Sequence, residues 1–416
     1  MTSKISKNQY SPSLFDITQD IIGGLPIKLI EYWLESPQTH EVAVELLTPY
    51  KIRGYSVSSD SAGLTKLTKE KGLLEILALI NQPKEIIYGI GTAIGGEGVG
   101  IWAADNTQMF YPASLSTDTI LSGLLTMRDE ISRNCQISIG IGAHYGEFYY
   151  ISGGLYGLEA DTIEAIAEND TEGGEILVSQ AIYDLLSSHS SFKFTKRTDL
   201  STPIGDIFRL LDGNRLSQVP EINKNYPIPY SDSFYADLLE YETRLTDREF
   251  AKILSAKYIA HKFVVLIERE SKAALTHEVG MFTNLSFSAL MKDIGMRLLP
   301  QTHGREIKVI SSLGIYTFNN PHPALEFAQA FRAELAAEDI ACRIGIDGGA
   351  ILVFDLSVGG KDIAGMPVNM ASKMAQDKGE FGKIYLNYGM KDYVDVSRFK
   401  EISYTVSGVD MTVYEG

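Results

Sequence analysis

The sequence predicts an α+β fold built from two copies of one domain. One observation is a repeat, because Gly157 and Gly365 each precede a helical pattern and lie 208 residues apart. The other is the alternation of short apolar strand patterns, such as 343–346, with helical patterns, such as 324–337. A repeat this long is a whole domain, so we expect two similar domains, each combining helices with a mixed sheet.

The repeat divides the chain into four predicted segments. We expect an N-terminal helical lead-in at 1–45, a first domain at 46–215, a linker with a helix at 216–258, and a second domain at 259–416. Prolines among polar residues predict the linker. Apolar residues at helical spacing predict helix over 10–50 and over 234–257, so each copy has a helical lead-in.

Composition excludes several classes of function. The chain has 416 residues and a net charge of −16, which argues against nucleic acid as a partner and gives no reason to expect binding to anionic membranes. Its two cysteines, Cys135 and Cys342, are too few for a disulfide framework, so we expect a reducing cytoplasmic location. The absence of an apolar run of transmembrane length predicts no membrane insertion.

The most informative run is Asp362–Met374, in which a glycine turn precedes a helix that begins at Pro367. Asn369 and Lys373 are four residues apart, so both project from one face of that helix. The Asp362 carboxylate can accept from an exocyclic amino group, while the amide and the ammonium can meet ribose and phosphate. The run therefore predicts a nucleotide-reading site.

This run resembles the class III nucleotidyl cyclases, the family that makes cyclic AMP or cyclic GMP. The segment 343–349 (RIGIDGG) resembles the family's R-I-G-I-H-x-G strand and turn, and 304–310 resembles the strand that enters its β-hairpin. Segments of the first copy that are similar to the family are 57–65, 95–102, 139–146, 156–161 and 173–179. The resemblance implies a ferredoxin-like βαββαβ core in each copy, with the copies packed as a pseudo-twofold dimer within one chain.

The resemblance assigns metal binding to the first copy. Asp60 and Glu97 stand where the family places two carboxylates that hold two Mg²⁺ or Mn²⁺ ions. A turn aspartate and an exposed glycine-loop glutamate are the structural alternatives for these two residues. At the corresponding positions the second copy has Arg269 and Ser312, although Glu268 and Glu270 flank Arg269, so a shift of one residue would place a carboxylate at the first position.

The resemblance assigns nucleotide reading to the second copy. Lys308 and Asp362 correspond to residues that read adenine, and Asn369 corresponds to the asparagine that orients ribose. Lys373 replaces an arginine that stabilises charge in the transition state, and it keeps the charge without bidentate geometry. The first copy has other residues at three of these reader positions and at the position of a phosphate-binding arginine, namely Ala93, Asp161, Ala165 and Gly140.

The resemblance implies a cyclase that converts ATP to 3′,5′-cyclic AMP and pyrophosphate at one inter-domain site. A catalytically degenerate protein that binds a nucleotide or small ligand and acts as a regulatory module is the alternative, and a guanylyl or pyrimidine cyclase is a third. ATP is the expected partner, while a regulatory protein or a small ligand at the degenerate pseudo-site is left open. A monomer is expected, because the dimer is built within the chain.

Overall fold

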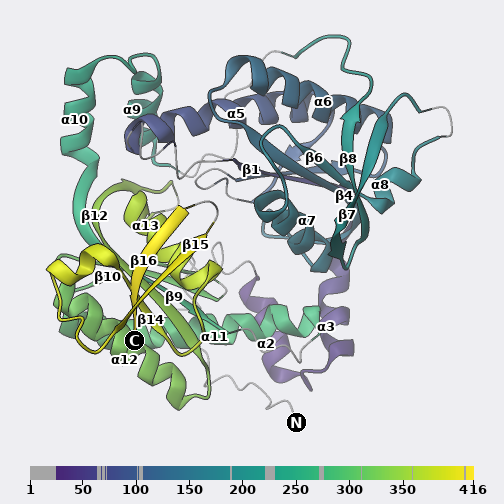
Figure 1. Ribbon diagram of the computed structural model, residues 1–416. Coiled ribbons are helices and arrows are strands. Elements are labelled where there is room, and N and C mark those ends of the chain that lie inside the picture. Colours follow the sequence, from purple (N-terminus) through teal and green to yellow (C-terminus); the bar gives the residue numbers. More distant parts are fainter. Residues whose placement is uncertain are drawn as a thin grey trace. The chain divides into compact units, whose positions relative to one another are not determined.

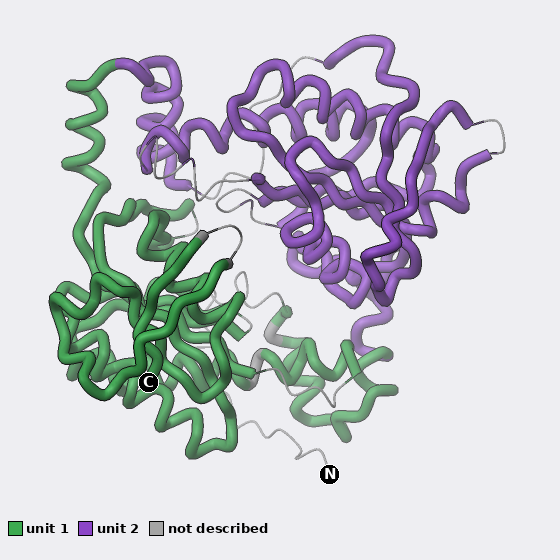
Figure 2. The backbone as a smooth tube through the Cα atoms, viewed as in Figure 1, with its two compact units in different colours: residues 1–44, 247–416 green, residues 45–246 purple. Residues whose placement is uncertain are grey.

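The computed structural model describes residues 25–62, 67, 71, 73–100, 102, 106–187, 190–220, 230–270, 276–310, 312–357, 359–406 and 409–416 (Figure 1). The chain forms two compact units (Figure 2). Unit 2 spans 45–246 and carries the first copy, whereas unit 1 combines 1–44 with 247–416 and carries the second copy.

The described part of unit 2 contains an eight-stranded sheet. Its order is β2-β3-β1-β4-β6-β8-β7, with β5 paired to β4, and all neighbouring pairs are antiparallel except β4 and β6. The strands are β1 (Lys51–Ser61), β2 (Glu97–Gly98), β3 (Thr107–Pro112), β4 (Ile139–Ile151), β5 (Gly154–Tyr156), β6 (Ile176–Ser179), β7 (Lys193–Thr202) and β8 (Gly205–Asp212).

The helices of unit 2 cover both faces of this sheet. Apolar side chains of α5 (Leu73–Ala93) and α6 (Thr117–Asn134) form the main core with one face, and α7 (Leu158–Asn169) packs on the other. Ser116 fixes the start of α6, because its hydroxyl accepts from the backbone N–H of Thr119. The remaining helices are the 3₁₀ turn η3 (Thr48–Tyr50), α8 (Gln180–Asp184) and α9 (Asp232–Glu242).

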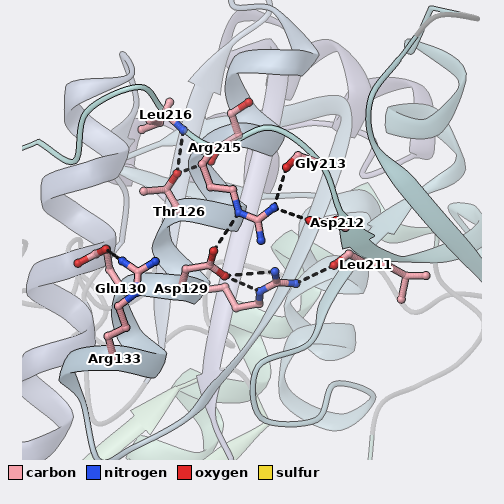
Figure 3. Close-up of polar contacts among 11 residues, drawn as sticks. Thr126, Asp129, Glu130, Arg133, Leu211, Asp212, Gly213, Arg215 and Leu216 are labelled. Carbon is pink, nitrogen blue, oxygen red and sulfur yellow. Dashed lines mark hydrogen bonds and ion pairs between the residues drawn. The ribbon is translucent and has the colours of Figure 1, made fainter.

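A polar cluster joins α6 to the chain that leaves β8 (Figure 3). Asp129 accepts from Arg215 at 2.9 Å and from Arg128 at 3.2 Å, and Arg215 also donates to Asp212 at 2.5 Å. The Thr126 hydroxyl accepts from the backbone N–H at position 216. These contacts hold the last residues of the first copy against its own core helix.

Unit 1 repeats this sheet. Among its described residues the order is β10-β11-β9-β12-β14-β16-β15, with β13 paired to β12, and the β12–β14 pair is parallel. The strands are β9 (Ile259–Arg269), β10 (Arg305–Ile310), β11 (Leu313–Phe318), β12 (Cys342–Asp355), β13 (Lys361–Ala364), β14 (Ile384–Asn387), β15 (Lys400–Val406) and β16 (Val409–Glu415).

Helices of unit 1 are arranged on its sheet in the same way. The long helices α11 (His277–Thr302) and α12 (Pro321–Ala337) form the main core with one face. The opposite face is covered by α13 (Met366–Ser372) and a π-helical turn, η4 (Lys373–Asp377). The other helices are α2 (Ile27–Glu35), α10 (Arg248–Tyr258) and the 3₁₀ turn η5 (Tyr388–Asp392), while α3 (His40–Leu47) crosses the boundary between the two units.

One helix of each lead-in, α2 or α9, packs on the long helix of the other copy, whereas α10 contacts β9 and β12 of its own copy. In unit 1, the Trp33 ring of α2 stacks on Phe282 of α11, with centroids 4.6 Å apart. In unit 2, α9 packs on α5, and Asn81 donates to Glu242 at 3.5 Å. The prediction of one helix over 234–257 was wrong in one respect, because the segment 243–247 separates α9 from α10. The Asp247 carboxylate then caps α10.

The fold class predicted from the sequence is confirmed, since both units contain helices and the βαββαβ strand order. The glycine of the repeat has the same role in each unit. Gly157 precedes α7 with a φ of 118°, and Gly365 precedes α13 with a φ of 141°. A side chain is strained at such angles, so glycine is required where each strand turns into its helix.

Candidate functional site

The two predicted adenine readers lie together in unit 1. Lys308 on β10 donates to the Asp362 carboxylate on β13 across 2.8 Å. The other carboxylate oxygen of Asp362 accepts from the backbone N–H of Ile363 at 2.8 Å. The Lys308 side chain is 29% exposed and that of Asp362 is 10% exposed, so the ammonium remains accessible while the carboxylate is nearly covered. This pair offers one donor and one acceptor side by side.

The other two predicted residues follow on one continuous helical segment. Asn369 is half-buried on α13, and no hydrogen bond to its side chain is found within the described residues. Lys373 is the first residue of the π-helical turn, and its ammonium lies 3.7 Å from the Asp377 carboxylate. Single π-turns inside helices are frequent at functional sites. The structure thus places all four predicted nucleotide readers in unit 1.

Two glycines of β12 let α13 lie directly on the sheet. A Cβ added at Gly345 would lie 2.1 Å from the backbone oxygen of Ala371, and one added at Gly349 would lie 3.1 Å from Pro367. The first distance is too short for any side chain. Gly345 therefore sets how closely the helix that carries Asn369 approaches β12.

The equivalent helix of unit 2 has the opposite charge character. Counting from the glycine turn, Asp161 and Ala165 of α7 stand where α13 and its π-turn have Asn369 and Lys373. Burial, together with the charges of Asp161 and a neighbouring glutamate, raises the pKa of Glu164 above its ordinary value. An acidic helix disfavours a triphosphate, so α7 lacks the positive charge that the predicted reader positions have in unit 1.

Asp60 lies near the end of β1 and is half-buried. Strand register identifies its counterpart in the second copy. Gly142 of β4 is opposite Ser58, and Gly345 of β12 is opposite Leu266. Two residues further along, Asp60 matches Glu268, so the sequence comparison that equated Asp60 with Arg269 was wrong by one residue.

The burial of each strand supports this register. Tyr55 and Val57 of β1 face the main core of unit 2, and Phe263 and Val265 of β9 face the main core of unit 1. Asp60 and Glu268 are half-buried and lie on the opposite face of their sheets, because successive side chains of a strand alternate. This alternation was readable in the sequence, since Arg269 falls on the core face.

Glu97 lies on the same face as Asp60 but elsewhere on the sheet. It is opposite Phe110 of β3, which is opposite Ser56 of β1. Asp60 is four residues further along β1 and two strands away, so the two backbone positions are about 16 Å apart at ordinary strand spacings. The structure does not bring the two predicted metal carboxylates together.

The same register changes the sequence alignment of the hairpin. Arg305 of β10 is opposite Thr317, which is opposite Val264, the match of Ser56. Glu97 therefore matches Arg305 rather than Ser312. Thr107 is opposite Ser59 and matches Gly314, so by sequence count the match of Ser312 is Asp105, which lies outside the described residues.

The described residues contain no cluster of three or more histidine, cysteine, aspartate or glutamate side chains placed to hold a metal ion. Within the same residues no helix is long and apolar enough to cross a membrane. Two-metal chemistry needs carboxylates close to both ions. The pair of Asp60 and Glu97 therefore does not fit the shared two-metal site that the resemblance implies.

Comparisons with known proteins define the fold. A class III adenylyl cyclase-like ATP-binding protein from Pseudomonas aeruginosa matches with a TM-score of 0.53 and 10% identity, over 82% of this chain and 85% of that chain. The adenylyl cyclase CyaB from P. aeruginosa matches 40% of this chain and 96% of its own, with 16% identity and a TM-score of 0.35.

The guanylyl cyclase Cya2 matches 38% of this chain and 91% of its own, with 10% identity and a TM-score of 0.34. No family model and no curated protein matches the sequence. The chain thus has the fold of class III nucleotidyl cyclase-like proteins, with two copies of that fold in one chain.

Proposed function

We propose that this protein binds ATP through its second cyclase-like domain and converts it to 3′,5′-cyclic AMP and pyrophosphate. The observation that supports the binding step is the pair of Lys308 and Asp362, whose charged groups are 2.8 Å apart. A lysine donor beside a carboxylate acceptor complements the ring nitrogen and the amino group of adenine. Guanine presents a carbonyl oxygen in place of that amino group, and Asp362 would repel it.

The remaining readers take the sugar and the phosphates. The Asn369 amide, which makes no hydrogen bond among the described residues, can contact ribose, and it lies four residues before Lys373 on the same helical segment. Lys373 supplies positive charge to the phosphates, once its weak contact with Asp377 at 3.7 Å is exchanged for a phosphate oxygen. In the predicted reaction the ribose 3′-oxygen bonds to the α-phosphorus, the bond to pyrophosphate breaks, and the 3′-hydroxyl proton is released.

Turnover, unlike binding, also depends on the first copy. A divalent cation bound there would lower the pKa of the ribose hydroxyl and neutralise the triphosphate. Asp60 is the carboxylate that we assign to this cation. Glu97 remains a predicted ligand, but its position two strands away makes Asp105 the alternative on sequence count.

The second candidate function is ATP binding without turnover. The separation of Asp60 and Glu97 on the sheet favours it, because a cyclase of this class needs two carboxylates in one place. It is also supported by the structure that matches both copies, which is described as a cyclase-like ATP-binding protein. Such a protein would signal through a partner rather than through a product.

Binding is tested by calorimetry with ATP and GTP on the wild type and on Asp362→Asn. Loss of the charged acceptor should weaken ATP binding about tenfold or more, because a hydrogen bond to a charged group is worth about 1.5–3 kcal/mol. Lys361→Ala is the matched control, since Lys361 lies next in sequence on β13 and pairs with Asp355 instead. Equal ATP affinity for wild type and Asp362→Asn, with both folded, would contradict the assignment.

Turnover is tested with ATP and Mn²⁺ by measuring cyclic AMP. A product that Asp60→Asn removes supports the cyclase, whereas ATP binding with no product supports the second candidate. Comparing Glu97→Gln with Asp105→Asn then identifies the second carboxylate. A product from GTP or from a pyrimidine nucleotide, and none from ATP, would establish the third possibility raised by the sequence.

A further inference from the structure

A cavity of about 450 Å³ lies in unit 1 at the C-terminal end of α12. Its lining comes from the last turns of α12, from the turn that leads into β12, and from Glu270 and Gly382. Pockets that bind small molecules usually have volumes of about 300–1,000 Å³, so the cavity is large enough for one. None of the four predicted nucleotide readers lines it, and α12 covers the opposite face of the sheet from α13. The cavity is therefore separate from the predicted readers.

Arg332 provides a fixed positive charge in this cavity. The Nη1 atom of its guanidinium donates to the backbone oxygens of Gly382 and Gly416, each at 3.0 Å. In the part of the chain that the structure describes, no hydrogen bond from its Nε or Nη2 atom is found. These two nitrogens form the edge with which a guanidinium binds a carboxylate through two parallel hydrogen bonds. Arg332 is thus held in place with its carboxylate-binding edge unused.

Glu270 provides a fixed negative charge in the same cavity. Its Oε1 atom accepts from the backbone N–H of Ala341 at 2.9 Å, and its own backbone N–H donates to the Ala341 oxygen at 2.8 Å. No donor to its Oε2 atom is found within the described residues, so this oxygen can accept from a ligand. Asp339 adds a second, exposed carboxylate to the lining. Arg332 forms no ion pair with either carboxylate among the described contacts, so both signs of charge remain available to one ligand.

Most of the remaining lining is small and apolar. Ala333, Ala336 and Ala341 leave space beside the charged groups, and Ile340 and Cys342 are 3% and 1% exposed. Burial raises the pKa of the Cys342 thiol to about 12, so the thiol adds no charge at neutral pH. A mainly apolar wall with a few fixed polar groups is typical of a small-molecule site.

We propose that this cavity binds a free amino acid with an apolar side chain. The α-carboxylate pairs with the unused edge of Arg332, the α-ammonium pairs with Glu270, and the side chain contacts the alanines. A phosphate or a dicarboxylate fits less well because Glu270 and Asp339 repel its second negative charge, and a polyamine fits less well because Arg332 repels it. This inference requires neither ATP binding nor turnover, so it is independent of the proposed function.

The probe for this site is L-leucine, whose binding to the full chain is followed by saturation-transfer NMR without nucleotide. Two analogues each lack one of its charges, since leucinamide has no carboxylate and 4-methylpentanoate has no ammonium. Both should bind at least tenfold more weakly than leucine, because each leaves one fixed charge of the cavity without its partner.

Two variants identify which residue meets which charge. Glu270→Gln keeps an acceptor for the N–H of Ala341 but removes the negative charge, so it should weaken leucine at least tenfold without weakening 4-methylpentanoate. Arg332→Gln should weaken leucine at least tenfold without weakening leucinamide. Ala333→Phe fills the cavity without changing a charge, and it should abolish the binding of all three compounds.

Glu334→Gln is the matched control. It removes a negative charge from the same helix, but Glu334 pairs with Arg297 at 3.2 Å and does not line the cavity, so leucine affinity should stay unchanged. Circular dichroism confirms that each variant is folded. If Arg332→Gln unfolds because Gly382 and Gly416 lose their donor, Glu270→Gln and Ala333→Phe still decide the test.

The proposal fails if neither leucine nor alanine, valine or methionine shows saturable binding to folded protein at millimolar concentration. It also fails if leucinamide or 4-methylpentanoate binds as tightly as leucine, since the charges of the cavity would then play no part. A loss in Glu334→Gln equal to that in Glu270→Gln would assign the effect to net charge and would overturn the site.

Discussion

The two units have similar residues on the core face of each sheet and different residues on the opposite face, where the predicted site residues lie. On the core face, aromatic and β-branched residues match, as in Tyr55 with Phe263 and Val57 with Val265. Side chains on or over the opposite face differ in charge. The matched pairs that differ are Gly140 with Arg343, His144 with Asp347, Asp161 with Asn369, and Ala165 with Lys373, whereas Asp60 and Glu268 are both carboxylates.

The difference shows that the two copies keep one fold while the charges on one face of the sheet change. Substitutions on the core face change volume in a close-packed interior and cost stability, so that face stays the same. The opposite face carries helices α7 and α13, where charge can change without loss of the fold. Four predictions test how far the two units have separated, from the largest expected effect to the smallest.

The largest effect on stability is expected at the contact between α2 and α11, where a helix of the first lead-in packs on the long helix of the second copy. Trp33 is 1% exposed and stacks on Phe282 of α11. Trp33→Ala should destabilise unit 1 by about 3–5 kcal/mol, because it leaves a cavity the size of an indole ring. Hydrogen exchange should show amides of α11 losing protection while those of α5 keep theirs.

The control for this prediction lies on the same helix. Tyr32 of α2 is 64% exposed, so Tyr32→Ala should leave the protection of α11 unchanged. Faster exchange in α5 on Trp33→Ala, to the same degree as in α11, would mean that the two units unfold together and are not separate in stability.

How much of this the sequence predicts can be argued from particular residues. The repeat and the glycine turns follow from pattern, because a glycine with positive φ is a local demand. Lys308 and Asp362 were predicted only through the family resemblance, and the ion pair between them is a tertiary contact that the structure shows. The π-turn at Lys373 does not, since it depends on how α13 continues over the sheet. The exchange of lead-in helices is likewise a tertiary choice that helical periodicity leaves open.

The two carboxylates predicted to bind metal in the first copy fit the structure less well, for a physical reason. Between β1 and β3 the first copy has a long helix and a loop, and nothing in a sequence fixes which loop residue reaches the strand. Hydrogen-bond register fixes it, by pairing Phe110 with both Glu97 and Ser56. A one-residue shift moves a side chain to the other face, which is why Glu268 rather than Arg269 matches Asp60.

The second prediction compares matched glycines under the two helices. Gly345→Ala places a methyl group 2.1 Å from a backbone oxygen of α13, whereas Gly142→Ala places one 3.0 Å from the Ile163 oxygen of α7. Overpacking against backbone should cost unit 1 about 3 kcal/mol and unit 2 about 1 kcal/mol. Gly345→Ala should also weaken ATP binding, since the helix with Asn369 must shift.

Tryptophan fluorescence separates the two units in this experiment. The chain has two tryptophans, Trp33 in unit 1 and Trp102 in unit 2. Urea unfolding of Gly345→Ala is followed in a Trp102→Phe background, and that of Gly142→Ala in a Trp33→Phe background. Equal losses in the two units would show that α7 and α13 lie equally close to their sheets.

The third prediction concerns a buried carboxylate beneath α13. Asp347 lies between Gly345 and Gly349 on β12, and burial raises its pKa to about 6 despite hydrogen bonds from Asn387 and the backbone N–H of Gly348. Because the pKa of Asp347 is higher in the folded state than its ordinary value of 3.8, folding favours the protonated carboxyl group. Below pH 3.8 the carboxyl group is neutral in both states and its burial costs no charge desolvation. As pH rises from 3.8 to about 6 the folded state loses stability, and above pH 6 the full cost of burying the charged carboxylate remains.

Asp347→Asn should remove this dependence. We expect the variant to be more stable than wild type by about 2 kcal/mol at pH 8 and by little at pH 4, measured by urea unfolding through Trp33 fluorescence. Asp355→Asn, an exposed carboxylate at the end of the same strand, is the control. A constant difference between the two pH values would show that Asp347 does not titrate in this range.

The smallest effect is expected in the polar cluster around Asp129 (Figure 3), which contains none of the residues predicted to bind a nucleotide. Burial raises the pKa of Asp129, but hydrogen bonds and charge from Arg215 and Arg128 outweigh it and hold that pKa below its ordinary value. The sign is therefore opposite to that of Asp347. The contribution to unit 2 is present above pH 3.8 and is lost as pH falls through the lowered pKa.

Asp129→Asn should lower the free energy of unfolding of unit 2 by about 1 kcal/mol at pH 7. The loss should vanish at a pH low enough to protonate Asp129 in both the folded and the unfolded state. Urea unfolding followed through Trp102 fluorescence measures both values. The control is Glu130→Gln, which removes the adjacent ion pair with Arg133, a side chain that is 65% exposed. A loss at pH 7 no larger than that of the control would mean that the cluster is only surface pairing. A larger loss would show that the cluster fixes the end of the first copy to its own core helix α6.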